Sequence, residues 1–409
     1  MKIKNVLLSI KDGSFLRKSY FHFFITAYPI YALFLQNKKI KKNKIVFCSY
    51  YGRGYGDNAK YIAEYILKHN LDYEIVWLID ENKCRSGDSL PSKIRKVRYA
   101  SFNSVKELST AEIWIDNCRK KYFPKKKSGQ IYIQTWHGTF ITKKIEADAD
   151  LPEGYIKMAK RDSSAIDYLL SSGKKRTEQF KRCFWYTGEI AETGSPRDDI
   201  LFDKNAKSEI KRKICSFYDF NIEKHILLYV PTFRNSYSLE PYSVDYEKLL
   251  SALKKRFGGE WQIITRLHPN MISFADKLNL PEFVINATLY SDMQELLCAS
   301  DAVLTDYSSM GDYSIYLKPL FMFCTDIDGY KKERGLQENL ESLPFPIARN
   351  NQELYENIVN FDKLKYEEKL SAYYKAEGFC ENGNASEKVM QLIKRRLSEK
   401  KIDFYAKLW

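Results

Sequence analysis

Closely spaced cysteines are absent from this chain of 409 residues, because its eight cysteines lie far apart in the sequence. This spacing argues against a zinc site and fits reduced thiols better than a disulfide framework. There is also no internal repeat of solenoid length and no low-complexity tract. The sequence therefore predicts an ordinary globular protein, without metal or cofactor, whose length allows two domains of roughly 200 residues each.

Acidic residues are scarce at the N-terminus, where residues 1–50 hold ten Lys or Arg and a single acidic residue. Between the basic clusters lies the aromatic stretch 20–35, which is too short and too interrupted for a membrane-spanning helix of about 20 apolar residues. No cleavage signature of a signal peptide follows it. The pattern favours residues 1–43 as a segment that lies in the interface of an anionic membrane leaflet. The alternative is an N-terminal helix that packs on the body of the protein and leaves its lysines solvated.

From Lys44 onward, short apolar runs alternate with segments of helical spacing. Such repeated strand and helix units predict an α/β fold with doubly wound parallel sheets. The alternation starts anew at His225, after the basic stretch 200–218. We therefore expect one Rossmann-like domain over 44–205, a second over 206–380 and a helical tail over 381–409. The strand candidates are 44–50, 73–79, 97–100, 112–117, 131–135, 167–171, 225–230, 261–267, 283–286, 302–305 and 320–323.

Two of the five histidines, His137 and His268, end apolar runs in opposite halves of the sequence. Ligands of open α/β sheets bind outside the carboxyl ends of the strands, so these histidines indicate chemistry between two halves. A single strand-end histidine more often caps a turn. The Gly-rich loop Gly52 to Gly56 lacks the full dinucleotide spacing, and a tight strand-to-helix turn is the better interpretation.

Five short motifs stand in order along residues 130–325. They are Trp136-His137-Gly138-Thr139, Thr193 to Asp198, Tyr229 to Arg234, Arg266-Leu267-His268-Pro269, and Thr305 to Ser309 with Asp312 and Lys318-Pro319. Together they resemble the CDP-glycerol glycerophosphotransferase family, the teichoic acid primases and polymerases. One departure is at Leu343 to Pro346, which follows Arg334-Gly335 where the family often shows a Pro-Gly element.

The resemblance implies a GT-B-like pair of Rossmann-like domains that face a central cleft. It implies transfer of a polyol phosphate, most often glycerol phosphate, from CDP-glycerol or CDP-ribitol to a lipid-linked glycan or polyol-phosphate acceptor, with release of CMP. Such a protein would lie peripherally on the cytoplasmic face of the bacterial membrane, in teichoic acid or capsule synthesis. A GT-B glycosyltransferase that uses a nucleotide sugar is the rival interpretation. The sequence shows no nucleic-acid recognition module, so no nucleic-acid partner is expected.

By the same resemblance, His137 is the expected base and His268 the expected partner of the donor pyrophosphate, although the two roles can be exchanged. Arg234 and Arg266 are expected to bind phosphate oxygens. For Arg197 the alternative is an interdomain ion pair, and for Asp306 a structural hydrogen bond is slightly preferred. For one of the two serines, helix N-capping is nearly as good an explanation. The remaining expected substrate-binding residues are Gly138, Thr232, Ser308, Ser309 and Asp312. The lysines near Arg119 to Lys127 form a weaker candidate surface for a polyanion.

Overall fold

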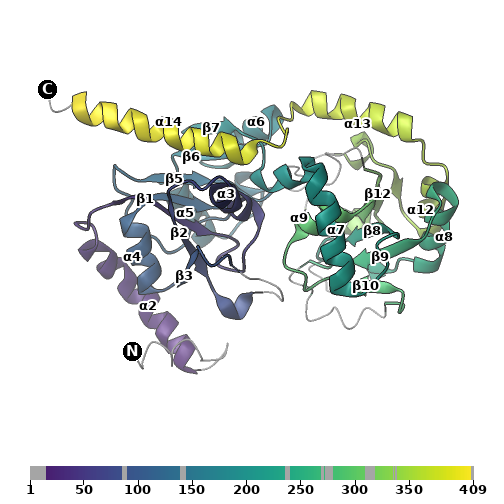
Figure 1. Ribbon diagram of the computed structural model, residues 1–409, viewed down its shortest axis with the longest axis horizontal. Coiled ribbons are helices and arrows are strands. Elements are labelled where there is room, and N and C mark those ends of the chain that lie inside the picture. Colours follow the sequence, from purple (N-terminus) through teal and green to yellow (C-terminus); the bar gives the residue numbers. More distant parts are fainter. Residues whose placement is uncertain are drawn as a thin grey trace.

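The computed structural model describes residues 15–84, 90–138, 144–234, 240–268, 271, 280–308, 318–334, 336 and 339–406. Two α/β halves lie side by side along the long axis of the molecule, and the last long helix runs back over the N-terminal half (Figure 1). Each half is built on one parallel sheet. The α/β prediction with two doubly wound domains is confirmed.

The N-terminal sheet has the strand order β3-β2-β1-β4-β5-β6-β7, and each of its described strand pairs is parallel. Along β1, Ile45 and Phe47 pack on one face of the sheet, whereas Val46 and Cys48 pack on the other. Because both faces are buried, the central strands carry continuous apolar runs rather than alternating ones. The strands are β1 Lys41–Cys48, β2 Glu74–Ile79, β3 Arg95–Arg98, β4 Ala111–Asp116, β5 Ile131–Gln134, β6 Tyr168–Ser171 and β7 Glu189–Glu192.

Helices cover both faces of this sheet. The N-terminal half contains α2 Phe15–Phe34, α3 Asp57–Lys68, α4 Phe102–Thr110, α5 Glu153–Ser163 and α6 Lys174–Cys183, with the short 3-10 turns η1 Glu81–Lys83 and η2 Glu146–Asp148. Helix α4 starts with a capping box. In it, the side chain of Ser101 accepts the backbone N–H of Ser104, and the side chain of Ser104 accepts the backbone N–H of Ser101. The segment η3 Pro196–Phe202 then leads into the second half.

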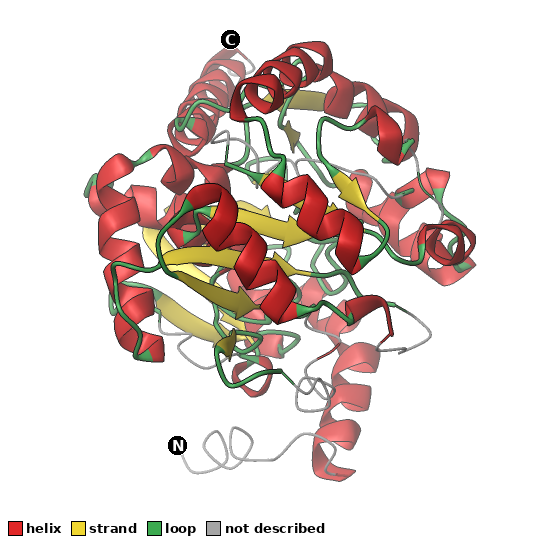
Figure 2. Cartoon of the chain, turned by 90° about the vertical axis from the view of Figure 1, so that its right-hand side faces the viewer, coloured by secondary structure: helices red, strands yellow, loops and turns green. Residues whose placement is uncertain are grey.

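The C-terminal sheet repeats the arrangement with the order β10-β9-β8-β11-β12-β13, again parallel in its described pairs. Its strands lie between helices on both sides (Figure 2). The strands are β8 His225–Val230, β9 Trp261–Thr265, β10 Val284–Asn286, β11 Ala302–Thr305, β12 Leu320–Phe323 and β13 Ile347–Ala348. The helical elements are α7 Lys204–Tyr218, η4 Glu240–Tyr242, α8 Tyr246–Phe257, α9 Met293–Ala299, α11 Ile327–Arg334, η6 Leu340–Ser342 and α12 Asn351–Val359.

The two last helices, α13 Lys363–Glu377 and α14 Ala385–Ala406, return the chain from the C-terminal to the N-terminal half (Figure 1). Val389 and Ile393 of α14 are fully buried in the core on one face of the N-terminal sheet. Asp199 accepts hydrogen bonds from the N–H groups of Ala385 and Ser386 and so caps the start of α14. The predicted tail 381–409 thus contributes Val389 and Ile393 to the N-terminal core.

Helix α2 lies beside α4 at the outer edge of the N-terminal half (Figure 1). Phe24, Tyr28, Ala32 and Leu35 are buried there in a small cluster with Val105. Strand β1 begins at Lys41, inside the segment 1–43 that was expected to precede the first domain. The N-terminal segment therefore includes a helix that packs on the body of the protein.

We expect Ile393→Ala to lower the free energy of unfolding by about 2–5 kcal/mol, because the truncation leaves a cavity where α14 meets the sheet. Lys394→Ala on the exposed side of the same helix is the matched control and should change stability by less than about 0.5 kcal/mol. Urea unfolding of both variants measures the difference. Equal stability of the two would mean that α14 is not part of the N-terminal core.

Candidate active site

His137 follows β5 at the carboxyl edge of the N-terminal sheet. Its Nδ1 lies 2.6 Å from the carbonyl oxygen of Asn117, which follows the neighbouring strand β4. A carbonyl oxygen only accepts hydrogen bonds, so Nδ1 carries the proton and donates it. In the neutral ring the lone pair is then on Nε2, which is the atom that can remove a proton from a substrate hydroxyl.

The surroundings keep this imidazole neutral. Burial lowers the pKa of His137 below its ordinary value, against the opposing effects of the Asn117 carbonyl and the Asp57 carboxylate. The ring of Tyr50 lies edge-on to the imidazole, with the two ring centres 5.5 Å apart. A neutral histidine at physiological pH is the form that a general base requires.

Arg197, from the Thr193 to Asp198 motif, lies in the same group of side chains. It forms an ion pair with Asp57 at 2.8 Å. Burial alone would raise the pKa of Asp57, but the Arg197 guanidinium holds it below its ordinary value. Asn58 accepts from the Arg197 N–H and donates to the carbonyl oxygen of Trp136, the residue before His137. The start of α3 therefore joins two of the sequence motifs.

In the C-terminal half, Arg234 lies at the carboxyl edge of the sheet and is almost completely buried, with 2% of its surface exposed. Its Nε and Nη2 donate to Asp326 at 2.7 and 3.0 Å, and Nη2 also lies 3.0 Å from Asp306. Its Nη1 donates to the carbonyl and hydroxyl oxygens of Thr232. These contacts account for all five N–H groups of the guanidinium. The geometry therefore favours Arg234 as a residue that positions the loops after β8, β11 and β12.

Asp306 fixes the same loops from the other side. Its carboxylate accepts the backbone N–H of Thr232 with both oxygens, at 2.8 and 3.1 Å. Burial raises the pKa of Asp306, although Arg234 opposes the shift. This is the structural hydrogen bond to a neighbouring loop that the sequence favoured for Asp306.

The other predicted residues of this half lie after β9 and β11. Arg266 donates from Nη2 to the carbonyl oxygens of Tyr290 and Ser291. His268 is exposed, and its ring lies 5.9 Å from that of Phe233. Ser308 is partly exposed after β11, whereas Ser309 and Asp312 lie outside the described residues.

Sequence reasoning missed the residues that hold His137 in place, namely Tyr50, Asp57, Asn58 and Asn117. Asp57 and Asn58 directly follow the Gly-rich loop, so the strand-to-helix turn was the available signal. The lysine clusters were also misread in part, because Arg119 is buried against Glu146 and Asp162, and Lys120 against Asp116. These two cations stabilise the fold and are not available to a polyanion.

Among the described residues no group of His, Cys, Asp and Glu has the arrangement of a metal site. Within the same part of the chain, none of the helices combines the length and the apolar character that crossing a bilayer requires.

Two doubly wound halves with polar residues at the carboxyl edges of their strands define a GT-B-like architecture. The model of the CDP-glycerol:poly(glycerophosphate) glycerophosphotransferase family matches residues 30–395. The chain therefore belongs to this family, and the resemblance read from the five motifs is confirmed.

Curated relatives agree with this assignment. The teichoic acid poly(glycerol phosphate) polymerase of Staphylococcus epidermidis is 33% identical over 90% of this chain, which spans only 53% of that longer relative. A polymerase of the same description from Bacillus spizizenii is 30% identical, over 89% of this chain and 94% of its own. The teichoic acid glycerol-phosphate transferase of Staphylococcus aureus is 29% identical, over 90% of this chain and 97% of its own. Ribitol-phosphate enzymes are also among the relatives.

Solved structures show the same fold. A His-to-Ala variant of the wall teichoic acid polymerase TagF superimposes with a TM-score of 0.79 and 28% identity, over 95% of this chain and 99% of that one. A His-to-Asn variant of TagF soaked with CDPG gives a TM-score of 0.78 and 32% identity, over 91% and 93% of the two chains. The GT-B-like prediction is confirmed.

We expect Arg234→Lys to destabilise the ligand-free protein, because an ammonium has three donors and cannot replace the five contacts of the guanidinium with Asp306, Asp326 and Thr232. Each buried acceptor that is left without a hydrogen bond lowers the free energy of unfolding by about 1–3 kcal/mol. Thermal melting without ligand measures the effect, with the exposed pair variant Arg349→Lys as the control. If melting is unchanged and only the affinity for a CDP-polyol falls, Arg234 instead binds the donor directly, as the sequence first suggested.

Proposed function

We propose that this protein transfers a polyol phosphate, glycerol phosphate foremost, from a CDP-polyol to a membrane-linked acceptor and releases CMP in teichoic acid synthesis. Membership of the glycerophosphotransferase family supports the reaction class. The observation that carries the proposal is the hydrogen bond from His137 Nδ1 to the Asn117 carbonyl, which fixes the tautomer that a base needs. CDP-ribitol is the second candidate donor for the same reaction, because the relatives include both glycerol-phosphate and ribitol-phosphate enzymes.

In the proposed reaction, His137 Nε2 takes the proton of an acceptor hydroxyl. The hydroxyl oxygen forms a bond to the phosphorus that carries the polyol, and the bond from that phosphorus to the bridging oxygen breaks. CMP leaves with the electron pair of the broken bond. The protein contributes by orienting the two substrates and by holding positive charge near the phosphoryl oxygens.

We assign the donor to the C-terminal half, at the carboxyl edge of its sheet, where ligands of such sheets bind. His268, Arg266, Thr232 and Ser308, with Ser309 and Asp312, are the residues we assign to it, and Arg234 positions the loops that carry several of them. Gly138 and Arg197 belong to the acceptor side, because both lie next to His137 or to the residues that hold it.

The test is release of CMP from CDP-glycerol, CDP-ribitol and a UDP-sugar control with lipid-linked acceptors. His137→Ala should lose about 10²–10⁴-fold in turnover and keep its affinity for the donor, because a base acts on the acceptor hydroxyl. His69→Ala, an exposed histidine at the end of α3, is the control. Release of UDP instead of CMP would establish the rival glycosyltransferase function. Normal turnover of His137→Ala would show that His137 is not the base.

The same assay has a pH signature. Since burial lowers the pKa of His137, the ring stays neutral further into the acid range than an ordinary histidine. The acid limb of the kcat/KM profile should therefore have its midpoint below about pH 6.5, which is the pKa of an unperturbed histidine. A midpoint above that pH would show that a group other than His137 controls the acid limb.

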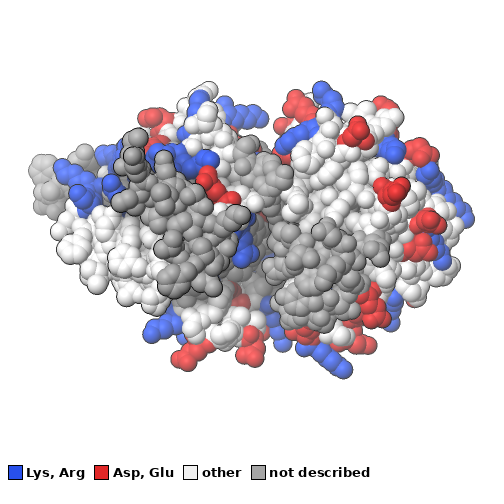
Figure 3. All heavy atoms as spheres, turned by 90° about the horizontal axis from the view of Figure 1, so that it is seen from below, with Lys and Arg blue, Asp and Glu red and all other residues white. Residues whose placement is uncertain are grey.

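We further propose that α2 attaches the protein to the cytoplasmic face of the membrane. The side of α2 opposite its buried cluster exposes Phe23, Ile30, Leu33 and Phe34, with 59 to 77% of their surfaces accessible. Exposed lysines follow at Lys38, Lys39, Lys41 and Lys42. An apolar face next to a basic cluster is the pattern of a helix that lies on an anionic leaflet. In Figure 3, Lys and Arg border a broad uncharged area of the N-terminal half.

Leu33→Asp should weaken binding to vesicles that contain phosphatidylglycerol by about tenfold or more, because a buried leucine contributes about 1.5–3 kcal/mol. Turnover of a lipid-linked acceptor should fall with it, whereas turnover of a soluble acceptor should not. Leu364→Asp is the matched control, since Leu364 is 79% exposed on α13, in the C-terminal half. Equal vesicle binding by the two variants would show that α2 is not the attachment site.

A further inference from the structure

A small polar pocket opens beside His137 at the carboxyl edge of the N-terminal sheet. Thr135, Ser172 and Ser195, which line it, follow the adjacent strands β5, β6 and β7. Asn58 and Gly138 complete the side toward the catalytic histidine. Asn58 is held at both ends of its amide by Trp136 and Arg197, so this wall of the pocket is fixed by the same bonds that position His137.

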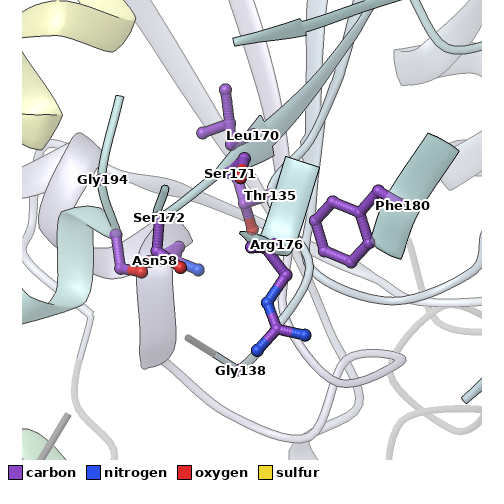
Figure 4. A pocket seen from close by; sticks show the side chains of 10 residues that line it. Asn58, Thr135, Gly138, Leu170, Ser171, Ser172, Arg176, Phe180 and Gly194 are labelled. Atoms are coloured by element: carbon purple, nitrogen blue, oxygen red, sulfur yellow. The ribbon is translucent and has the colours of Figure 1, made fainter. Parts of the chain in front are cut away.

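Among the described residues that line the pocket, Arg176 is the one with a charge. Its side chain reaches from α6 toward the backbone of Gly138, across the pocket from Asn58 and Ser172 (Figure 4). A guanidinium among hydroxyl and backbone groups, with no lining carboxylate in the described part of the chain, matches an anion that has several oxygen acceptors.

The first turn of α6 gives an independent indication. It contains Lys174, Lys175 and Arg176, no acidic residue, and no side-chain cap at Gly173. The start of a helix carries partial positive charge, so cations are normally disfavoured there and anions favoured. Lys175 pairs with Glu377 across the halves. Arg176 donates from Nη1 to the side-chain oxygen of Gln179 and also lines the pocket, where a bound anion would offset the unfavourable placement of its charge.

We propose that this pocket binds a phosphate group of the acceptor, the phosphodiester or phosphate next to the hydroxyl that attacks the donor. The inference rests on the proposed function and names the chemistry of its acceptor. The pocket lies in the N-terminal half, next to the base, whereas the donor is assigned to the C-terminal half. A phosphate held by Arg176 would place the adjoining polyol hydroxyl near His137, and it would select acceptors that end in a polyol phosphate.

The direct test is calorimetric titration of the full chain with glycerol 3-phosphate, in saturating CMP so that the donor side is filled. Glycerol without the phosphate is the comparison ligand. We expect glycerol 3-phosphate to bind and glycerol not to bind, and Arg176→Gln to weaken the binding about tenfold or more, as for loss of a charge-assisted hydrogen bond. Lys181→Gln, an exposed change of equal charge near the other end of α6, should bind as the wild type does. If Arg176→Gln is poorly folded by thermal melting, Arg176→Lys replaces it and should bind more weakly than the wild type.

Turnover distinguishes the two possible sources of the phosphate. Arg176→Gln should raise KM for an acceptor that ends in glycerol phosphate and leave KM for CDP-glycerol unchanged. A rise in KM for CDP-glycerol alone would assign the pocket to the donor and overturn the proposal. Absence of glycerol 3-phosphate binding by the wild type, or equal binding by the wild type and the Arg176 variant, would also overturn it. Failure of the proposed function would show separately, as no CMP release by the wild type, and the titration would still decide whether the pocket binds phosphate.

Discussion

The buried charge of Lys60 ties the two halves together, and the geometry of the active site depends on that contact. Lys60 lies in the middle of α3 and forms ion pairs with Asp292 and Glu295 of the C-terminal half. Tyr61 adds a hydrogen bond to Asp292 at 3.1 Å. Burial alone would lower the pKa of Lys60, but these carboxylates raise it, so the charge is retained. Removal of one partner from such a pair costs about 3–5 kcal/mol, because the other charge remains buried.

The first residues of the same helix hold the loop that carries His137. Asp57 and Asn58 contact Arg197 and the Trp136 carbonyl, and Trp136 precedes His137. The backbone is strained around this point, since Tyr50, Asp57 and Trp136 all have positive φ although none of them is glycine. Such conformations cost of order 1–3 kcal/mol each and persist where the surrounding contacts enforce them. The strained residues lie around the His137 imidazole, as the proposed base would require.

The sequence predicted what depends on local pattern. Both sheets follow from apolar runs that are buried on two faces, and His137 was found because it ends such a run. The predicted binding role of Arg234 rested on residue type and on the match of the Tyr229 to Arg234 motif, whereas the five bonds of its guanidinium depend on loops far apart in the sequence. Strand β7, with the sequence Glu-Ile-Ala-Glu, lacks an apolar run because it is the edge of the sheet and is partly exposed. The packing of α2 and α14 on the N-terminal half is a tertiary contact that periodicity does not encode.

In the proposed reaction each lobe holds part of the reaction centre, so the two lobes must also keep a fixed relation to each other. Besides the Lys60 contact, Gln294 at the start of α9 donates to Asp198 of η3, next to Arg197. Asp199, the following residue, caps α14. Three consecutive residues of one 3-10 segment thus contact the start of α3, helix α9 of the C-terminal half and the returning helix α14. Because η3 joins all three, a shift of the C-terminal half relative to α3 strains the Arg197 to Asp57 pair directly. The position of the C-terminal half and the loop of His137 are therefore coupled through η3.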